Sequence, residues 1–181
     1  MKEALLLIDI QNDYFQGGKA ELHKPMDALE NAEMVLKKFR QSGTPVIHVQ
    51  HVSINEGATF FLPDTQGVKI HERLVPLQNE TVVVKHAPSS FYNTNLLDVI
   101  RENAITELVV CGMMSHMCID TTVRACKDHG LKVMLLDDAC ATKNLKYRDT
   151  VIPAETVHRT FMAALNGMFA SVMSTQEYLL K

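Results

Sequence analysis

Residues 107–130, ELVVCGMMSHMCIDTTVRACKDHG, contain the pattern that decides the fold. The segment opens with an apolar run at residues 107–111, which predicts a strand buried on both faces. A short loop after Gly112 leads to an amphipathic stretch at residues 118–129, which predicts a helix. Gly130 stands where a helix C-cap is expected. A buried strand followed by an amphipathic helix is the unit from which helix-covered parallel sheets are built.

The same unit recurs along the whole chain. Strands are predicted at residues 4–10, 45–50, 81–85, 107–111, 131–136 and about 170–173. Helices are predicted near residues 27–42, 92–103, 118–129 and 154–167. This alternation predicts an α/β protein, with a three-layer α-β-α, Rossmann-like fold around a mainly parallel sheet. A length of 181 residues without repeats or linkers predicts a single domain spanning residues 1–181.

Composition narrows the class of protein. The net charge is −3 and no basic cluster occurs, which argues against a nucleic-acid or anionic-membrane partner. The N-terminus lacks the pattern of a secretory signal, and no apolar run approaches the length of a membrane span. We therefore expect a soluble, cytoplasmic protein that acts on a small molecule. In that compartment its four cysteines are expected to be thiols.

The cysteines differ in their positions along these elements. Cys111 closes an apolar strand and Cys126 lies on the apolar face of a helix, so both are interpreted as core residues. No C-x-x-C pair is present, which argues against zinc. Cys118 stands in the first turn of the helix, where the helix terminus favours a thiolate and lowers a thiol pKa. Cys140, after another strand end, is the rival nucleophile.

Two charged residues stand at other strand ends, where ligand sites of parallel sheets form. Asp9 interrupts the apolar run ALLLIDI, so it either caps a loop or serves as a general base for the thiol. Lys85 closes the third strand, and it either reaches solvent or balances the charge of Asp9 and a thiolate. Asp9, Lys85 and Cys118 together form a base, cation and nucleophile set. Free backbone N–H groups of Met117 and Cys118 could hold an oxyanion.

Three blocks of sequence carry a resemblance to a known family. The blocks are DIQNDYF at residues 9–15, KHAPSSFYNTNL at residues 85–96 and CGMMSHMCI at residues 111–119. They are similar to the D-x-Q-N-D-F, K-x-x-x-S-A-F-x-x-T-x-L and G-x-x-T-x-x-C-V motifs of the isochorismatase-like cysteine hydrolases, with Ser115 for the usual Thr. This superfamily includes nicotinamidases, N-carbamoylsarcosine amidases and ureidoacrylate amidases. The resemblance covers nearly the whole chain.

The resemblance implies a catalytic triad of Asp9, Lys85 and Cys118, which hydrolyses its substrate through a thioester-like intermediate. It also implies a six-stranded sheet in the order 3-2-1-4-5-6. A cis peptide is expected between Met113 and Met114, together with an oxyanion hole from the backbone of Met117 and Cys118. The family usually forms dimers or tetramers, so a homodimer or homotetramer is expected.

Departures from the family motifs point to a branch. Nicotinamidases bind a metal through an Asp-x-His pair after strand two, whereas this chain has QHVS at residues 50–53. We therefore predict no metal and no other cofactor. Because Cys118 is retained, hydrolysis of a carbon–nitrogen bond is favoured over isochorismate-type ether hydrolysis. A non-catalytic binding subunit on the same fold, and a redox protein pairing Cys118 with Cys140, are further alternatives.

The substrate pocket is predicted from motif positions. Residues expected to line it are Gln11, Phe15, Ser90, Phe91 and His116. The irregular stretch at residues 51–80 is long enough to indicate a loop that lines a site or an interface. Four histidines, His51, His71, His86 and His116, fall in or near these loops, and for each a polar loop residue is the favoured interpretation. His116, within the nucleophile loop, is the strongest of them as a site residue.

Overall fold

The computed structural model describes residues 2–181. Its centre is a six-stranded parallel sheet in the order β3-β2-β1-β4-β5-β8. The strands are β1 (Glu3–Ile8), β2 (Val46–His51), β3 (Thr81–Lys85), β4 (Glu107–Met113), β5 (Lys132–Ala141) and β8 (Ser171–Met173). The predicted order 3-2-1-4-5-6 is confirmed. The sixth position belongs to β8 because β6 (Leu145–Tyr147) and β7 (Thr150–Ile152) form a separate antiparallel hairpin.

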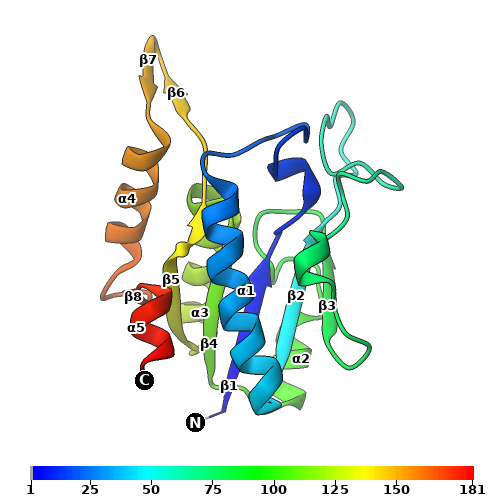
Figure 1. The fold of residues 1–181 in the computed structure, drawn as a ribbon, viewed down its shortest axis with the longest axis vertical. Coiled ribbons are helices and arrows are strands. Elements are labelled where there is room, and N and C mark those ends of the chain that lie inside the picture. Colours follow the sequence, from blue (N-terminus) through cyan, green and yellow to red (C-terminus); the bar gives the residue numbers. More distant parts are fainter. Residues whose placement is uncertain (1) are drawn as a thin grey trace.

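Helices cover both faces of the sheet, as predicted for a three-layer fold. They are α1 (Pro25–Ser42), α2 (Leu96–Glu102), α3 (Asp120–Asp128), α4 (Ala154–Leu165) and α5 (Thr175–Leu179). Figure 1 shows α1 in front of the sheet, with α2 and α3 behind it and the β6–β7 hairpin projecting away from the body. Gly43 ends α1 in the left-handed conformation, at φ 67°, which glycine adopts without strain.

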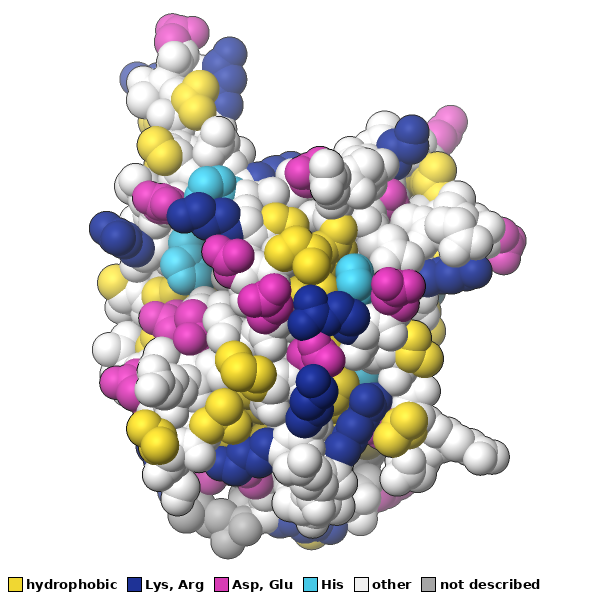
Figure 2. Space-filling view, viewed as in Figure 1, with side chains coloured by type: hydrophobic (Ala, Val, Ile, Leu, Met, Phe, Trp, Pro, Cys, Tyr) yellow, Lys and Arg dark blue, Asp and Glu magenta, His cyan; other side chains and the backbone are white. Residues whose placement is uncertain are grey.

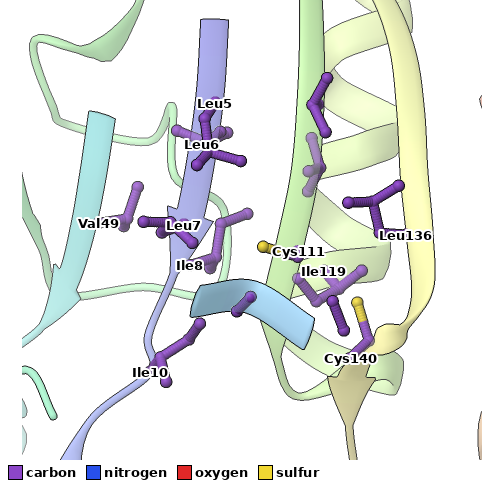
Figure 3. Packing of buried hydrophobic residues seen from close by; sticks show 14 of the residues in the cluster. Leu5, Leu6, Leu7, Ile8, Ile10, Val49, Cys111, Ile119, Leu136 and Cys140 are labelled. Carbon is purple, nitrogen blue, oxygen red and sulfur yellow. The ribbon is translucent and has the colours of Figure 1, made fainter. Parts of the chain in front are cut away.

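The core is built around β1. Its run from Leu5 to Ile8 is buried because hydrogen-bonded strands flank it and helices cover the two faces of the sheet. Figure 3 shows these side chains between Val49 of β2 and Cys111 of β4. Cys111 and Cys126 are both fully buried, which confirms their interpretation as core residues. Burying each such leucine stabilises the fold by roughly 2 kcal/mol. The packing of β1 therefore fixes the positions of the neighbouring strand ends.

Several boundaries differ from the sequence prediction. β1 ends at Ile8 and not at residue 10, because Asp9 adopts a left-handed backbone with φ 52°. β5 continues to Ala141, so Cys140 lies within a strand and is 7% exposed. The edge strand β3 exposes Val82 and Val84, so it is not buried on both faces. The β6–β7 hairpin and α5 were not predicted, because each is too short to carry a clear periodic pattern.

Two features describe the surface and the helices. On the face shown in Figure 2, acidic and basic side chains are interspersed. Among residues 2–181, no helix combines the length and the apolar character that crossing a bilayer requires.

Candidate active site

The chain places three sequence-predicted residues together at the carboxyl edge of the sheet. Asp9 directly follows β1, and Lys85 is the last residue of β3. Cys118 lies in a π-helical turn, Ser115–Ile119, which continues into α3 after β4. Because β1 pairs with β4 and, through β2, neighbours β3, all three strand ends open onto the same crevice.

Lys85 lies at the centre of the group. Its Nζ lies 2.7 Å from Asp9 Oδ2 and 3.2 Å from Cys118 Sγ, and it donates to the Ala87 carbonyl at 3.0 Å. It also lies 3.1 Å from His51 Nδ1. Asp9 and Lys85 are fully buried and Cys118 is 6% exposed. The Asp9 carboxylate and the Cys118 thiol thus share the buried ammonium group of Lys85. Burying these charges costs free energy, so each partner must be held in place.

The environment sets the protonation states of this group. Burial opposes the charge of Lys85, but the neighbouring Asp9 and Cys118 outweigh it and raise the lysine pKa. Burial and the Asp9 carboxylate raise the pKa of the Cys118 thiol, and Lys85 offsets only part of this. The prediction that a helix terminus lowers this pKa is therefore wrong for the unliganded protein. Desolvation and the Asp9 carboxylate favour the protonated thiol in the unliganded protein.

Asp9 is placed to receive that proton. Its side chain is fully buried, and within the described part of the chain neither carboxylate oxygen has a hydrogen-bond donor of good geometry. Oδ2 faces the Lys85 ammonium. An acceptor oxygen without a donor costs free energy in a buried site, so a proton arriving from the thiol would relieve that cost.

The loop before the nucleophile has the predicted cis peptide, between Met113 and Met114. One of the two predicted oxyanion donors is already engaged. The Met117 N–H donates to the Met114 carbonyl at 3.0 Å, so that donor is engaged in the unliganded protein. The roles of Met117 and Cys118 in holding an oxyanion remain predictions.

Two predicted pocket residues, Gln11 and Ser90, form hydrogen bonds that hold the structure around the site together. Gln11 is fully buried, and its amide donates to the carbonyls of His51 and Val68 and accepts from the His51 N–H. Ser90 is also fully buried, and both its N–H and its hydroxyl bond to the Thr122 hydroxyl. These bonds join loops to β2 and α3, and the contact of Gln11 and Ser90 with substrate stays a prediction.

The other predicted pocket residues lie at different distances from the nucleophile. The Phe91 ring packs 4.7 Å from the ring of His129, at the far end of α3. At a rise of 1.5 Å per residue, His129 lies roughly 16 Å along the helix from Cys118. Phe91 therefore packs toward the far end of α3, and its place in the substrate pocket stays a prediction. His116 bonds to the Thr142 hydroxyl at 2.6 Å, a contact that turns it toward the end of β5. Phe15 packs 4.4 Å from the His71 ring, within the loop that was predicted to line the site.

That loop does cover the strand ends. Phe61 is buried, with its ring 4.7 Å from the Tyr14 ring and 5.9 Å from the His51 ring. Its N–H donates to the buried carboxylate of Asp13, which fixes the loop to the segment after β1. Burial, then the charges of Cys118 and Asp9, raise the pKa of Tyr14, so this phenol is also a neighbour of the triad. Sequence reasoning treated Tyr14 only as part of a motif.

Three of these side chains could in principle bind a metal. One ligand atom each of Asp9, His51 and Cys118 lies within 4.8 Å of the others. The Lys85 ammonium contacts all three, however, and supplies the positive charge that a metal would otherwise provide. The residues therefore fit an internal cation better than a metal ion.

A separate cavity of about 430 Å³ opens between α1, the end of β5 and α4. Its lining mixes acidic Asp27 and Asp137 with basic Lys24 and Arg159. The triad residues do not line it.

Comparison with known proteins agrees with the fold and the motif blocks. The Isochorismatase domain family matches residues 3–177. An uncharacterized isochorismatase family protein of Bacillus subtilis, YddQ, is 54% identical over 179 residues, covering 99% of both chains. A crystal structure assigned to isochorismatase hydrolases, from Oleispira antarctica, superimposes with a TM-score of 0.96 at 44% identity, covering 99% of this chain and 97% of that one. A ureidoacrylate amidohydrolase of Acinetobacter baylyi is 25% identical over 97% of this chain and 82% of its own.

The chain therefore belongs to the isochorismatase family of hydrolases.

Proposed function

We propose that the chain hydrolyses a carbon–nitrogen bond of a small molecule, of amide or carbamoyl type, with Cys118 as nucleophile. The observation that carries this proposal is the buried group in which one ammonium, Lys85 Nζ, contacts both the Asp9 carboxylate and the Cys118 thiol. A relative named as an amidohydrolase supports the choice of bond. The retained thiol favours covalent catalysis over direct attack by water.

The first half of the reaction forms the acyl-enzyme. As the substrate carbonyl approaches, the Cys118 proton moves to Asp9 Oδ1 and the sulfur attacks the carbonyl carbon. Lys85 stabilises the sulfur while it carries negative charge. The tetrahedral intermediate then collapses: the carbon–nitrogen bond breaks, the leaving nitrogen takes the proton from Asp9, and a thioester remains on Cys118.

The second half returns the enzyme to its starting state. Asp9 takes a proton from water, and the hydroxide attacks the thioester carbon. The carbon–sulfur bond breaks, the acid product leaves, and Cys118 recovers its proton from Asp9. Because the thiol pKa is raised in the free protein, deprotonation has to be coupled to substrate binding and not completed beforehand.

The test is ammonia release from a panel of small amides and ureido compounds, followed by rapid acid quench and mass mapping. We expect at least one compound to release ammonia and to leave an acyl group on Cys118. Cys118→Ala and Asp9→Asn should abolish both signals, whereas Cys140→Ala serves as a matched cysteine control and should keep them. Cleavage of isochorismate without any amide hydrolysis would favour the ether alternative. Binding of a compound without turnover would favour a non-catalytic subunit.

A further inference from the structure

His51 and Lys85 are brought together by the register of the sheet. They are the last residues of the neighbouring parallel strands β2 and β3, and they are direct partners in the ladder. Side chains of paired residues project from the same face of a sheet, which explains the 3.1 Å contact between His51 Nδ1 and Lys85 Nζ.

The backbone of His51 is fixed as firmly as the triad. The fully buried Gln11 amide donates to the His51 carbonyl at 2.9 Å and accepts from the His51 N–H at 2.8 Å. This pair of bonds holds both polar groups of the residue from the β1 side. Orientation of the imidazole is thus determined by two neighbouring strand ends.

The contact with Lys85 determines which imidazole nitrogen carries the proton. An ammonium group donates only, so Nδ1 must accept and the proton resides on Nε2. Burial and the charge of Lys85 lower the pKa of His51, which keeps the ring neutral near pH 7. His51 therefore presents an N–H donor on the side of the ring that faces away from Lys85.

That donor lacks a protein partner. Within residues 2–181, no acceptor is hydrogen-bonded to His51 Nε2, whereas Nδ1, N–H and carbonyl are all engaged. Asp9, Lys85 and Cys118 are almost entirely buried, but His51 is half-buried. A nitrogen of the ring lies within 4.8 Å of the Cys118 sulfur. The half-buried ring therefore keeps one unpartnered N–H donor close to the nucleophile.

We propose that His51 is a substrate-binding residue whose Nε2–H donates to an oxygen of the molecule that Cys118 attacks. This inference rests on the proposed function, because it takes Cys118 as the nucleophile. It defines the substrate class further: a small molecule with a carbonyl or carboxylate oxygen at, or next to, the scissile carbon. A neutral donor beside Lys85 suits such an acceptor and offers nothing to an ammonium or guanidinium group.

The experiment compares two alkylating probes on Cys118, with products mapped by mass spectrometry. Iodoacetamide carries a carbonyl next to the reacting carbon, whereas methyl iodide has no acceptor. Both react with the same thiolate, so the ratio of their rate constants cancels any change in thiolate availability. In His51→Phe, which keeps an aromatic ring against Phe61, we expect the ratio to fall about threefold to tenfold, the effect of one lost hydrogen bond.

Two further variants separate binding from packing. His51→Gln places an amide nitrogen at about the depth of Nε2, so we expect it to restore most of the ratio. His86→Phe is the matched control: His86 contacts the Val52 carbonyl on the exposed side, and the ratio should stay unchanged. If both rate constants fall equally in His51→Phe, so that their ratio is unchanged, the proposal is overturned in favour of a structural role.

A spectroscopic measurement decides the inference independently of thiol reactivity. In protein labelled with 15N-histidine, His51 should appear as the neutral Nε2–H tautomer, and Lys85→Met should release that preference. The Nδ1–H tautomer in the wild type would overturn the proposal. If Cys118 reacts with neither probe in the wild type, its raised thiol pKa accounts for that result, and the tautomer alone decides the inference about His51. The nucleophile assignment is tested separately by mapping the acyl group on Cys118.

Discussion

The buried ion pair between Asp9 and Lys85 gives the sharpest prediction for stability. Both side chains are fully buried and lie 2.7 Å apart. Lys85→Met keeps the aliphatic stem and removes the ammonium, which leaves the Asp9 carboxylate buried without its ion partner. Removing one member of a buried pair costs about 3–5 kcal/mol, and we expect a loss of that size in the free energy of unfolding.

Urea unfolding followed by circular dichroism measures this loss, since the chain has no tryptophan. At a slope of about 2 kcal/mol per molar urea, the midpoint should fall by about 2 M. The double variant with Asp9→Asn should cost less than the sum of the single variants, by about 2 kcal/mol or more, because both charges are then absent. Lys37→Met is the matched control: Lys37 pairs with Glu33 at the surface, and its loss should cost under about 1 kcal/mol.

Two results would refute the reasoning. A loss of less than about 1 kcal/mol in Lys85→Met would mean that the pair contributes no more than a surface salt bridge. Strict additivity in the double variant would mean that the two side chains do not interact.

Three further predictions concern residues outside the triad. Burial raises the pKa of Glu80, but hydrogen bonds from Arg40, the Leu77 N–H and His48 together outweigh this and hold the pKa at about 2, below the ordinary 4.5. The ionised Glu80 carboxylate thus stabilises the folded protein by about 3 kcal/mol above pH 4.5, and this contribution is lost as the pH falls toward 2. In Glu80→Gln, the free energy of unfolding should depend less on pH across that range. Gly112→Ala should lower the free energy of unfolding in urea by about 3 kcal/mol or more. The added Cβ would lie 2.0 Å from the Ile8 carbonyl oxygen, at a backbone φ of 135°. Wild-type stability of this variant would contradict that overlap. Thr122→Val should lower the melting temperature by several degrees in calorimetry, because it leaves two buried polar groups of the neighbouring loop unpaired; an unchanged melting temperature would mean that those bonds are dispensable.

Some site residues could be predicted because their chemistry conflicts with their surroundings. Asp9 stands out as a carboxylate in an apolar strand, and Lys85 as a cation at the end of another. A buried charge must be paired or functional, so the sequence pattern alone indicates both residues. Cys118 is distinguished from Cys111 and Cys126 by its position relative to the helical apolar face.

Other residues could not be assigned from the sequence, because their roles depend on partners far along the chain. Gln11 and Ser90 occupy motif positions next to the site, but their hydrogen bonds reach His51 and Thr122. No local pattern distinguishes a polar side chain that contacts substrate from one that joins two loops. His51 was one of four loop histidines until the register of β2 and β3 set it against Lys85.

The sequence by itself determined the α/β class, most strand and helix positions, and the three charged or reactive residues at strand ends. These follow from apolar periodicity and from the cost of burying charge, which are local properties of the chain. Only the tertiary structure decided the protonation of Cys118 and the neighbours of His51. Burial and the Asp9 carboxylate raise the thiol pKa against the local effect of the helix end, because desolvation depends on everything packed around the sulfur.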